Sequence, residues 1–372
     1  MRWYNSARLD INMEKNQSVF PIIRQSDSQF EELEEPPFSD GPLPATLVDN
    51  LGRTINSLRI SITDRCNLRC IYCMPEEVEF MNRSELLTYE EITRFVQILV
   101  PLGISKLRIT GGEPTIRKDL PELIRQLADI ESIKDIAMTT NGIFLKQQAG
   151  PLRAAGLHRV NISLDTLVRD KFFEITRRDS LQQVMEGIEE SERVGFAPIK
   201  VNAVAIRGFT DDEILNFARL ARRKNFEVRF IEFMPLDADD NWERQKVLPG
   251  REIIDQIHQR YPLEPVNNSA AKEPATLYRF RDGVGGDIGI IPSVSEPFCD
   301  NCNRIRITSD GKLRTCLFSI REMDVRSLLR GGASGEEIAR AVVKAVWNKE
   351  PGHKINHKDF VKPERAMFSI GG

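Results

Sequence analysis

Three cysteines lie in the stretch Thr63-Asp-Arg-Cys-Asn-Leu-Arg-Cys-Ile-Tyr-Cys-Met-Pro75, at Cys66, Cys70 and Cys73. Thiolates are soft ligands that select zinc, copper(I) or iron–sulfur clusters. A structural zinc site has four protein ligands, and no histidine or fourth cysteine lies near this run. Three thiolates on a [4Fe-4S] cluster leave one iron open, so the count favours such a cluster. An incomplete zinc site and buried thiols are the alternatives.

The spacing Cys-x₃-Cys-x₂-Cys, with Tyr72 before the last cysteine, resembles the radical S-adenosylmethionine (SAM) superfamily. The resemblance implies that the open iron chelates the amino and carboxylate groups of SAM. A second feature, Gly111-Gly112-Glu113-Pro114, follows a predicted strand. Glycines let a ligand approach the backbone closely, and Glu113 offers a carboxylate to an ammonium group. A plain strand-to-helix turn, with proline at helix entry, is the alternative.

Composition excludes several classes of protein. The 372 residues are 41% hydrophobic and 29% charged, enough for one large domain and a smaller one. The net charge of −3 gives no support for nucleic-acid binding. Neither a membrane span nor a signal peptide is expected. Because all six cysteines fall in two groups, metal binding in a reducing compartment is expected, and hence a cytoplasmic protein.

From about residue 57, short β-branched runs alternate with amphipathic segments. The predicted strands are 58–63, 106–110, 135–140, 159–164, 199–205 and 228–233, and the predicted helices between them are 88–100, 120–130, 145–155, 181–194 and 211–223. Two further helices are predicted at 250–262 and 334–347. Such β-then-α units imply parallel strands. Thr88 and Thr210 are expected to cap two of the helices.

Polar residues at the strand ends distinguish a barrel from an open sheet. All six predicted strands carry them, which suits a ring of strands better than an open sheet with one switch point. The prediction is an α/β fold, a partial (β/α)₆ TIM-type barrel. Residues 1–45 are expected to be a poorly ordered extension, 46–240 the barrel, and 241–372 a C-terminal region carrying a second cluster and a Gly-Gly tail.

The second cysteine group comprises Cys299, Cys302 and Cys316. Zinc completed by His353 or His357 is one interpretation, and a second cluster with an open iron is favoured. The two clusters are expected to face each other across the barrel mouth.

The second cysteine group contains the run Arg304-Ile305-Arg306. On an extended segment this run would place both guanidinium groups on one face, which suits binding of phosphate or carboxylate. Two solvated surface arginines are the alternative.

A nucleotide here would be bound by scattered cations, because the chain has no Gly-x₄-Gly-Lys-Ser/Thr run. The candidates are Arg59, Arg108, Lys200, Arg304 and Arg306. Placing such residues inside predicted strands costs desolvation free energy, which indicates an anionic ligand. Structural ion pairs are the competing interpretation for each one.

Together with the terminal Gly371-Gly372, these motifs resemble the GTP 3′,8-cyclase family of molybdenum cofactor biosynthesis, over about residues 46–372. The resemblance implies two [4Fe-4S] clusters, one bound with SAM by Cys66, Cys70 and Cys73, and one bound with substrate by Cys299, Cys302 and Cys316. It implies SAM contacts from Tyr72, Gly112, Ser163 and Met234. It implies GTP contacts from Arg59, Arg108, Thr139, Lys200, Arg304, Ile305 and Arg306, with Arg304 and Arg306 also catalytic.

The implied reaction is a lyase reaction that begins the pathway. A 5′-deoxyadenosyl radical from SAM removes the 3′ hydrogen of GTP, and the carbon radical attacks guanine C8, giving (8S)-3′,8-cyclo-7,8-dihydroguanosine 5′-triphosphate. Implied partners are a flavodoxin- or ferredoxin-type reductant and a downstream cyclic pyranopterin monophosphate synthase, and a homodimer is allowed. The alternatives are a peptide-modifying maturase with two clusters and an iron–sulfur electron-transfer or sensing module.

Overall fold

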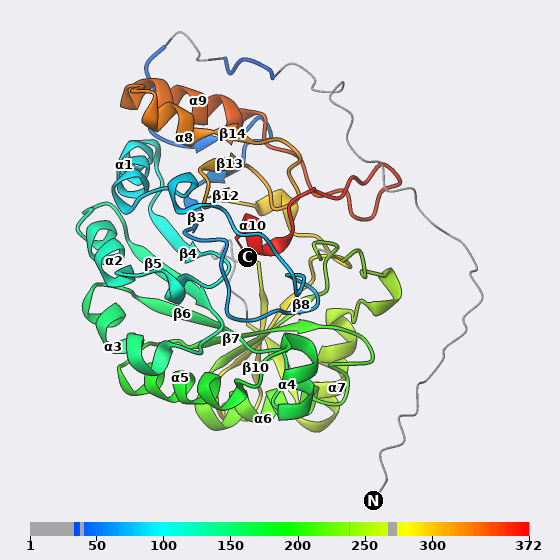
Figure 1. Ribbon diagram of the computed structural model, residues 1–372. Helices are drawn as coiled ribbons and strands as arrows, with labels where there is room; N and C mark the ends of the chain where they lie inside the picture. The colour runs from blue at the N-terminus through cyan, green and yellow to red at the C-terminus, as the bar shows by residue number, and fades with distance from the viewer. Residues whose placement is uncertain (1–32, 38–40, 238, 267–273, 372) are drawn as a thin grey trace, which may run out of the picture.

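A curved sheet organises the computed structural model, which describes residues 33–37, 41–237, 239–266 and 274–371. Six parallel strands lie side by side in chain order along its middle. They are β3 (Ser57–Ser61), β4 (Lys106–Thr110), β5 (Asp135–Thr140), β6 (Arg159–Ser163), β7 (Lys200–Ala205) and β8 (Glu227–Glu232). Figure 1 shows these strands as an arc with helices outside it. The predicted partial (β/α)₆ barrel is therefore confirmed.

The C-terminal region extends this sheet at both ends. Strand β12 (Arg304–Ile307) pairs in parallel with β3, and β11 (Asp287–Ile291) pairs in parallel with β8. Antiparallel strands follow on each side: β13 (Lys312–Arg314) and β14 (Met323–Asp324), then β10 (Thr276–Phe280) and β9 (Leu263–Pro265). Within the described residues β14 and β9 are the two ends of the strand order, so the barrel stays open. A separate hairpin joins β1 (Leu47–Val48) and β2 (Thr54–Ile55).

The helices that cover the sheet agree with the predicted periodicity. The predicted ones are α1 (Tyr89–Leu99), α2 (Leu120–Ala128), α3 (Leu145–Ala154), α5 (Leu181–Arg193) and α6 (Ile214–Lys224). Helix α4 (Arg169–Thr176) was not expected. In the C-terminal region the two predicted helices are present as α7 (Gly250–Arg260) and α9 (Gly335–Trp347), and α8 (Val325–Arg330) and α10 (Met367–Ile370) were not expected. None of the helices in the described ranges is long and apolar enough to cross a bilayer.

One of the two predicted helix caps is present. The Thr88 side chain accepts a bond from the Glu91 N–H and begins α1 in a capping box. The prediction for Thr210 was wrong, because α6 begins at Ile214. The Thr210 hydroxyl instead accepts from the Ile206 N–H at 3.0 Å, which ties it to the turn after β7.

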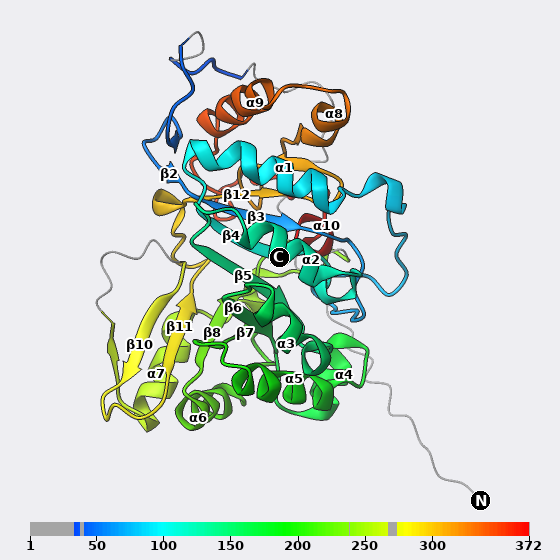
Figure 2. The same ribbon diagram turned by 90° about the vertical axis from the view of Figure 1, so that its left-hand side faces the viewer.

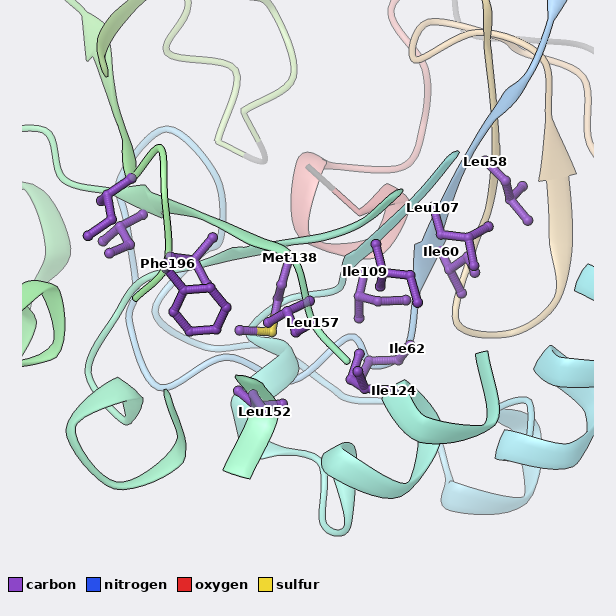
Figure 3. Close-up of a cluster of buried hydrophobic side chains, with 14 of the residues drawn as sticks. Leu58, Ile60, Ile62, Leu107, Ile109, Ile124, Met138, Leu152, Leu157 and Phe196 are labelled. Atoms are coloured by element: carbon purple, nitrogen blue, oxygen red, sulfur yellow. The ribbon is translucent and has the colours of Figure 1, made fainter. Parts of the chain in front are cut away.

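Alternation along the strands separates an apolar face from a polar one. Leu58, Ile60, Leu107, Ile109 and Met138 are almost fully buried on the helix side, where Figure 3 shows them packed together. The residues between them in sequence are polar and line the concave side. In Figures 1 and 2 helix α10 lies within this concave side. The inner face of the sheet is therefore suited to binding a polar ligand.

The predicted N-terminal extension is described only in part, since residues 1–32 and 38–40 lie outside the described ranges. Its described residues lie against α9: the Glu34 N–H donates to Asn348 Oδ1 at 2.9 Å, and Arg340 donates to the Gly41 carbonyl at 3.1 Å. The division at residues 45 and 240 stays a prediction.

Candidate functional site

The first cysteine loop follows β3 and is fastened to the glycine turn after β4. The Gly112 N–H donates to the Thr63 carbonyl at 2.6 Å, and the Glu113 N–H donates to the Arg65 carbonyl at 2.7 Å. A Cβ atom at Gly112 would overlap the Arg65 carbonyl and lie 2.7 Å from the Asp64 carbonyl oxygen. Glycine is therefore required because two backbones touch here.

This close contact makes Gly112→Ala a test of the loop. We expect iron bound after anaerobic reconstitution to fall by about half, because the added methyl group pushes the cysteine loop away at a cost of about 1–3 kcal/mol. Gly150→Ala in α3 is the matched control, since no atom lies within 4 Å of its Cβ position. Iron counting and thermal melting check both. Full iron content in Gly112→Ala would contradict the assignment.

The thiols of Cys66, Cys70 and Cys73 are free and partly screened from solvent. Burial raises the pKa of all three, that of Cys66 to about 11. The Cys66 sulfur accepts from the Leu68 N–H at 3.4 Å, and a backbone bond from Phe368 in α10 lowers the pKa of Cys73. Buried thiols that accept N–H bonds fit an iron–sulfur cluster, whose iron supplies the positive charge that thiolates need.

In the described part of the chain, no three or more His, Cys, Asp and Glu side chains are gathered so as to bind a metal ion. The cluster interpretation does not require such a gathering, since each thiolate of a [4Fe-4S] cluster binds a different iron. A single zinc ion at either cysteine group does require one.

The Glu113 carboxylate has hydrogen-bond partners within the protein that the sequence did not indicate. It is 1% exposed, and its carboxylate accepts from the Thr115 and Thr140 hydroxyls at 2.5 and 2.6 Å and from the Asn141 N–H at 2.6 Å. The side chain thus ties the turn after β4 to the turn after β5. The amide of Asn141 in turn donates to Asn67 Oδ1 at 2.7 Å, within the cysteine loop.

Tyr72 is oriented by a carboxylate at the end of β6. Its hydroxyl donates to Asp165 Oδ2 at 2.6 Å, and Asp165 Oδ1 accepts from the Val204 N–H at 2.9 Å. Ser163 lies two residues earlier on the polar face of β6, half-buried. Met234 follows β8 and packs beside a separate apolar cluster. The sequence had marked Asp165 only as a polar residue at a strand end.

Asp165 predicts a pH dependence of stability. Burial raises the pKa of its carboxyl from 3.8 to about 6, so the folded chain binds this proton more tightly than the unfolded chain. Its contribution to the free energy of unfolding is therefore full below about pH 4 and is lost as pH rises through about 6. Relative to wild type, Asp165→Asn should gain roughly 2–3 kcal/mol between pH 4 and pH 7.

Urea unfolding of the metal-free chain at several pH values measures that difference. Asparagine keeps a hydrogen bond to Val204 and to Tyr72, so the fold is retained. Asp179→Asn is the control: this carboxylate is exposed and paired with Arg169, and the Arg169 hydrogen bond lowers its pKa. A difference between wild type and Asp165→Asn that does not change with pH would contradict the assignment.

The second cysteine group lies at the other end of the barrel. Cys302 stands just before β12 and Cys316 just after the antiparallel β13, so both lie toward the amino ends of the parallel strands. Cys66 follows the carboxyl end of β3. The expectation that both groups meet across one mouth was therefore wrong, because β12 runs parallel to β3. The inner face of the sheet lies between the two groups.

Buried cations surround the second group. Burial alone would raise the pKa of Cys302, but Arg304 and Lys349 lower it to about 6. Burial raises the pKa of Cys316, against the effect of Lys349. The His353 ring lies 5.2 Å from the Phe318 ring, and its pKa is lowered by burial. The described residues do not bring His353 or His357 into a three-ligand set with these cysteines.

A row of arginines crosses the inner face between the two cysteine groups. Strand register pairs Arg306 with Arg59, and Arg59 with Arg108; on the other side Arg306 pairs with Arg314 of β13. Arg314 is balanced by Glu322. Burial, with Arg304, Arg306 and Arg108 nearby, lowers the pKa of Arg59 well below its usual value. Cations placed together in this way favour an anionic ligand.

Arg306 also contacts the C-terminal tail. It is 5% exposed and donates from Nη1 to the Gly371 carbonyl at 3.0 Å. Gly371 lies so close to the inner face that a Cβ atom there would be 2.7 Å from Ser61 and from Thr110. Burial lowers the pKa of Arg306 to about 9. The predicted approach of Gly372 lies outside the described residues.

The remaining predicted substrate residues divide into two sets. Thr139 and Lys200 both pair with Asn161, in the row beyond the arginines. Lys200 also forms an ion pair with Glu227 at 3.3 Å, a partner that the sequence did not indicate because the predicted strand began at residue 228. The side chain of Ile305 lies on the opposite face in the apolar core, so a substrate contact there would come from its backbone.

Known proteins match this chain along most of its length. Residues 60–221 match the Radical SAM superfamily, and residues 226–355 match the family described as Molybdenum Cofactor Synthesis C. A GTP 3′,8-cyclase of Rhodopirellula baltica is 46% identical over 333 residues, 88% of this chain and 93% of that protein. The chain belongs to the GTP 3′,8-cyclase family. Another member, from Thermodesulfovibrio yellowstonii, is 46% identical and covered over 99% of its length.

Members of the GTP 3′,8-cyclase family differ in how much of this chain they match. The member from Mycolicibacterium smegmatis is 41% identical over 357 residues, 95% of this chain. Among solved structures, Streptococcus suis SuiB bound to S-adenosylmethionine is similar with a TM-score of 0.58, over 84% of this chain and 77% of that one. At 15% identity this likeness supports the fold alone.

Proposed function

We propose that this chain converts GTP to (8S)-3′,8-cyclo-7,8-dihydroguanosine 5′-triphosphate, a lyase reaction that opens molybdenum cofactor biosynthesis. The observation that carries the proposal is the arginine row formed by Arg59, Arg108 and Arg306 between two three-cysteine groups. A peptide-modifying maturase has no need of such a row. A small electron-transfer module has no need of a barrel with a polar inner face.

GTP binding follows from the charges on that inner face. Arg59, Arg108, Arg304 and Arg306 would bind phosphate oxygens as planar forks, and Lys200 would bind as a point charge. Thr139 lies in the next row and would donate to the ribose or a phosphate oxygen. Lys200 and Arg306 are almost fully buried and the other side chains are partly buried, so each charge-assisted bond contributes about 1.5–3 kcal/mol.

The first cysteine group would bind a [4Fe-4S] cluster with SAM on its open iron. When bound, this pair supplies a 5′-deoxyadenosyl radical. The chain positions the pair: Tyr72 is fixed by Asp165, and Gly112 brings its turn against the loop. Ser163 and Met234 would contact SAM from the ends of β6 and β8. The tail helix α10 lies on the concave side, where it would exclude water from the bound cofactor.

Cys299, Cys302 and Cys316 would hold a second [4Fe-4S] cluster, whose open iron would supply a binding site for the guanine base. Its place at the amino ends of the strands leaves the ribose between the two clusters. Removal of the 3′ hydrogen, attack on C8, and addition of one electron and one proton give an isomer of GTP. Arg304 and Arg306 stabilise the negative charge that arrives with the electron.

An external one-electron reductant of flavodoxin or ferredoxin type would supply both electrons of a turnover, the one that cleaves SAM and the one that completes the product. A cyclic pyranopterin monophosphate synthase would use the product. We also propose a cytoplasmic location, where thiols stay reduced. A homodimer agrees with the proposal without being required by it.

Anaerobic turnover with GTP deuterated at the ribose 3′ position tests the reaction. We expect GTP-dependent release of 5′-deoxyadenosine that carries the deuterium, together with a cyclised isomer of GTP. Release that is the same without GTP, or 5′-deoxyadenosine free of deuterium, would reject the proposal.

A further inference from the structure

Lys349 is a buried cation next to the second cysteine group. It follows α9 and is 2% exposed. Its ammonium group donates to the Arg304 carbonyl at 3.2 Å and to the Thr315 carbonyl. These carbonyls belong to the two segments that carry Cys302 and Cys316. One ammonium group therefore joins both ligand segments.

No carboxylate neutralises this ammonium in the described part of the chain, where both of its hydrogen-bond partners are backbone oxygens. The adjacent Glu350 directs its carboxylate to the hydroxyls of Thr315, at 2.6 Å, and Ser319. A buried charge without a partner strongly opposes folding. Such a charge is expected where an anion binds, and a cluster bound by three thiolates is an anion.

Arg53 connects the same segment to the third cysteine. It is 6% exposed and paired with Asp49. Its guanidinium group donates to the Cys299 carbonyl at 3.0 Å, the Pro351 carbonyl at 2.9 Å and the Glu350 carbonyl at 2.7 Å. The segment 349–351 is thus linked to the backbone near all three predicted ligands, directly through Lys349 for Cys302 and Cys316 and through Arg53 for Cys299.

We propose that Lys349 is the counter-ion of the second cluster: its charge offsets the thiolates, and its two bonds set the separation of the Cys302 and Cys316 segments. The inference rests on the second cluster of the proposed function. Because a one-electron reduction adds negative charge to the cluster, a fixed cation favours the reduced form. Lys349 acts through the cluster and is a positioning residue.

The test uses the full-length chain with Cys66, Cys70 and Cys73 replaced by alanine, so that bound iron reports the second site. Into this parent are placed Lys349→Met, which removes the charge and keeps the length, and Lys349→Arg, which keeps the charge. Lys312→Met is the matched control, because its ammonium group is already paired with Asp324. Iron per chain and the ratio of reduced to oxidised cluster at a fixed potential are measured, the latter by electron paramagnetic resonance.

We expect Lys349→Met to lower the ratio of reduced to oxidised cluster about tenfold, which is about 59 mV for one electron, or to lose iron. Lys349→Arg and Lys312→Met should stay within about twofold of the parent. If Lys349→Met matches the parent in iron and ratio, or if Lys349→Arg is as impaired as Lys349→Met, the counter-ion role is overturned. A parent that binds no iron would instead reject the second cluster itself, and this inference with it.

Discussion

Replacing Cys70 with alanine should abolish SAM cleavage and leave about four irons per chain. Cys70 is the central thiol of the first group, and burial raises its pKa well above the usual value. Only a bound cation can keep such a thiol ionised, so its loss removes a ligand that no neighbour can replace. The measurements are 5′-deoxyadenosine release with dithionite and iron counting under anaerobic conditions.

Ile71→Ala is the matched control for this experiment. Ile71 lies in the same loop with its side chain 37% exposed, and its backbone N–H bond to the Ile175 carbonyl does not depend on the side chain. This variant should cleave SAM within about twofold of wild type. Retained cleavage in Cys70→Ala would remove Cys66, Cys70 and Cys73 from the SAM site.

Replacing Arg306 with alanine should reduce formation of the cyclised product by roughly 100-fold or more while both clusters are retained. Arg306 occupies the middle of the arginine row and is almost fully buried. Its removal deletes a desolvated fork from the triphosphate site and a bond to the Gly371 carbonyl. Product is quantified by chromatography after a single anaerobic turnover, with iron content measured on the same sample.

Two further variants separate recognition from stability. Arg306→Lys keeps the charge but not the fork, and should recover only part of the activity. Arg281→Ala truncates an exposed arginine in the same region of sequence and should leave turnover unchanged. Full activity of Arg306→Ala would exclude Arg306 from the site.

Local sequence patterns predicted the six barrel strands because each is a short β-branched run bounded by turn residues. Such patterns do not predict which strands pair with each other, as β12 shows. Arg304-Ile305-Arg306 predicted an extended segment, but nothing in it says that Arg306 pairs with Arg59 across almost 250 residues of chain. The same pairing places Cys302 and Cys66 at opposite ends of the barrel. The expectation that the two clusters face each other across one mouth was wrong for this reason.

Partner residues of the site were harder to predict than its metal ligands. Cysteine spacing is a strong signal because thiolate chemistry leaves few alternatives. Asp165, Glu227 and Lys349 carry no motif, and each is recognised only by what it touches: Tyr72, Lys200, and the carbonyls beside two cysteines. Their roles depend on tertiary contacts between segments far apart in sequence.

Two three-cysteine groups lie at opposite ends of one polar barrel, and counting the iron bound at each group tests the two-cluster assignment most directly. Mössbauer spectroscopy and iron analysis of the anaerobically purified chain should give about eight irons in two [4Fe-4S] clusters. About four should remain when either Cys66, Cys70 and Cys73 or Cys299, Cys302 and Cys316 are replaced by alanine. About four irons in the intact chain, or zinc in place of iron at Cys299, Cys302 and Cys316, would contradict it.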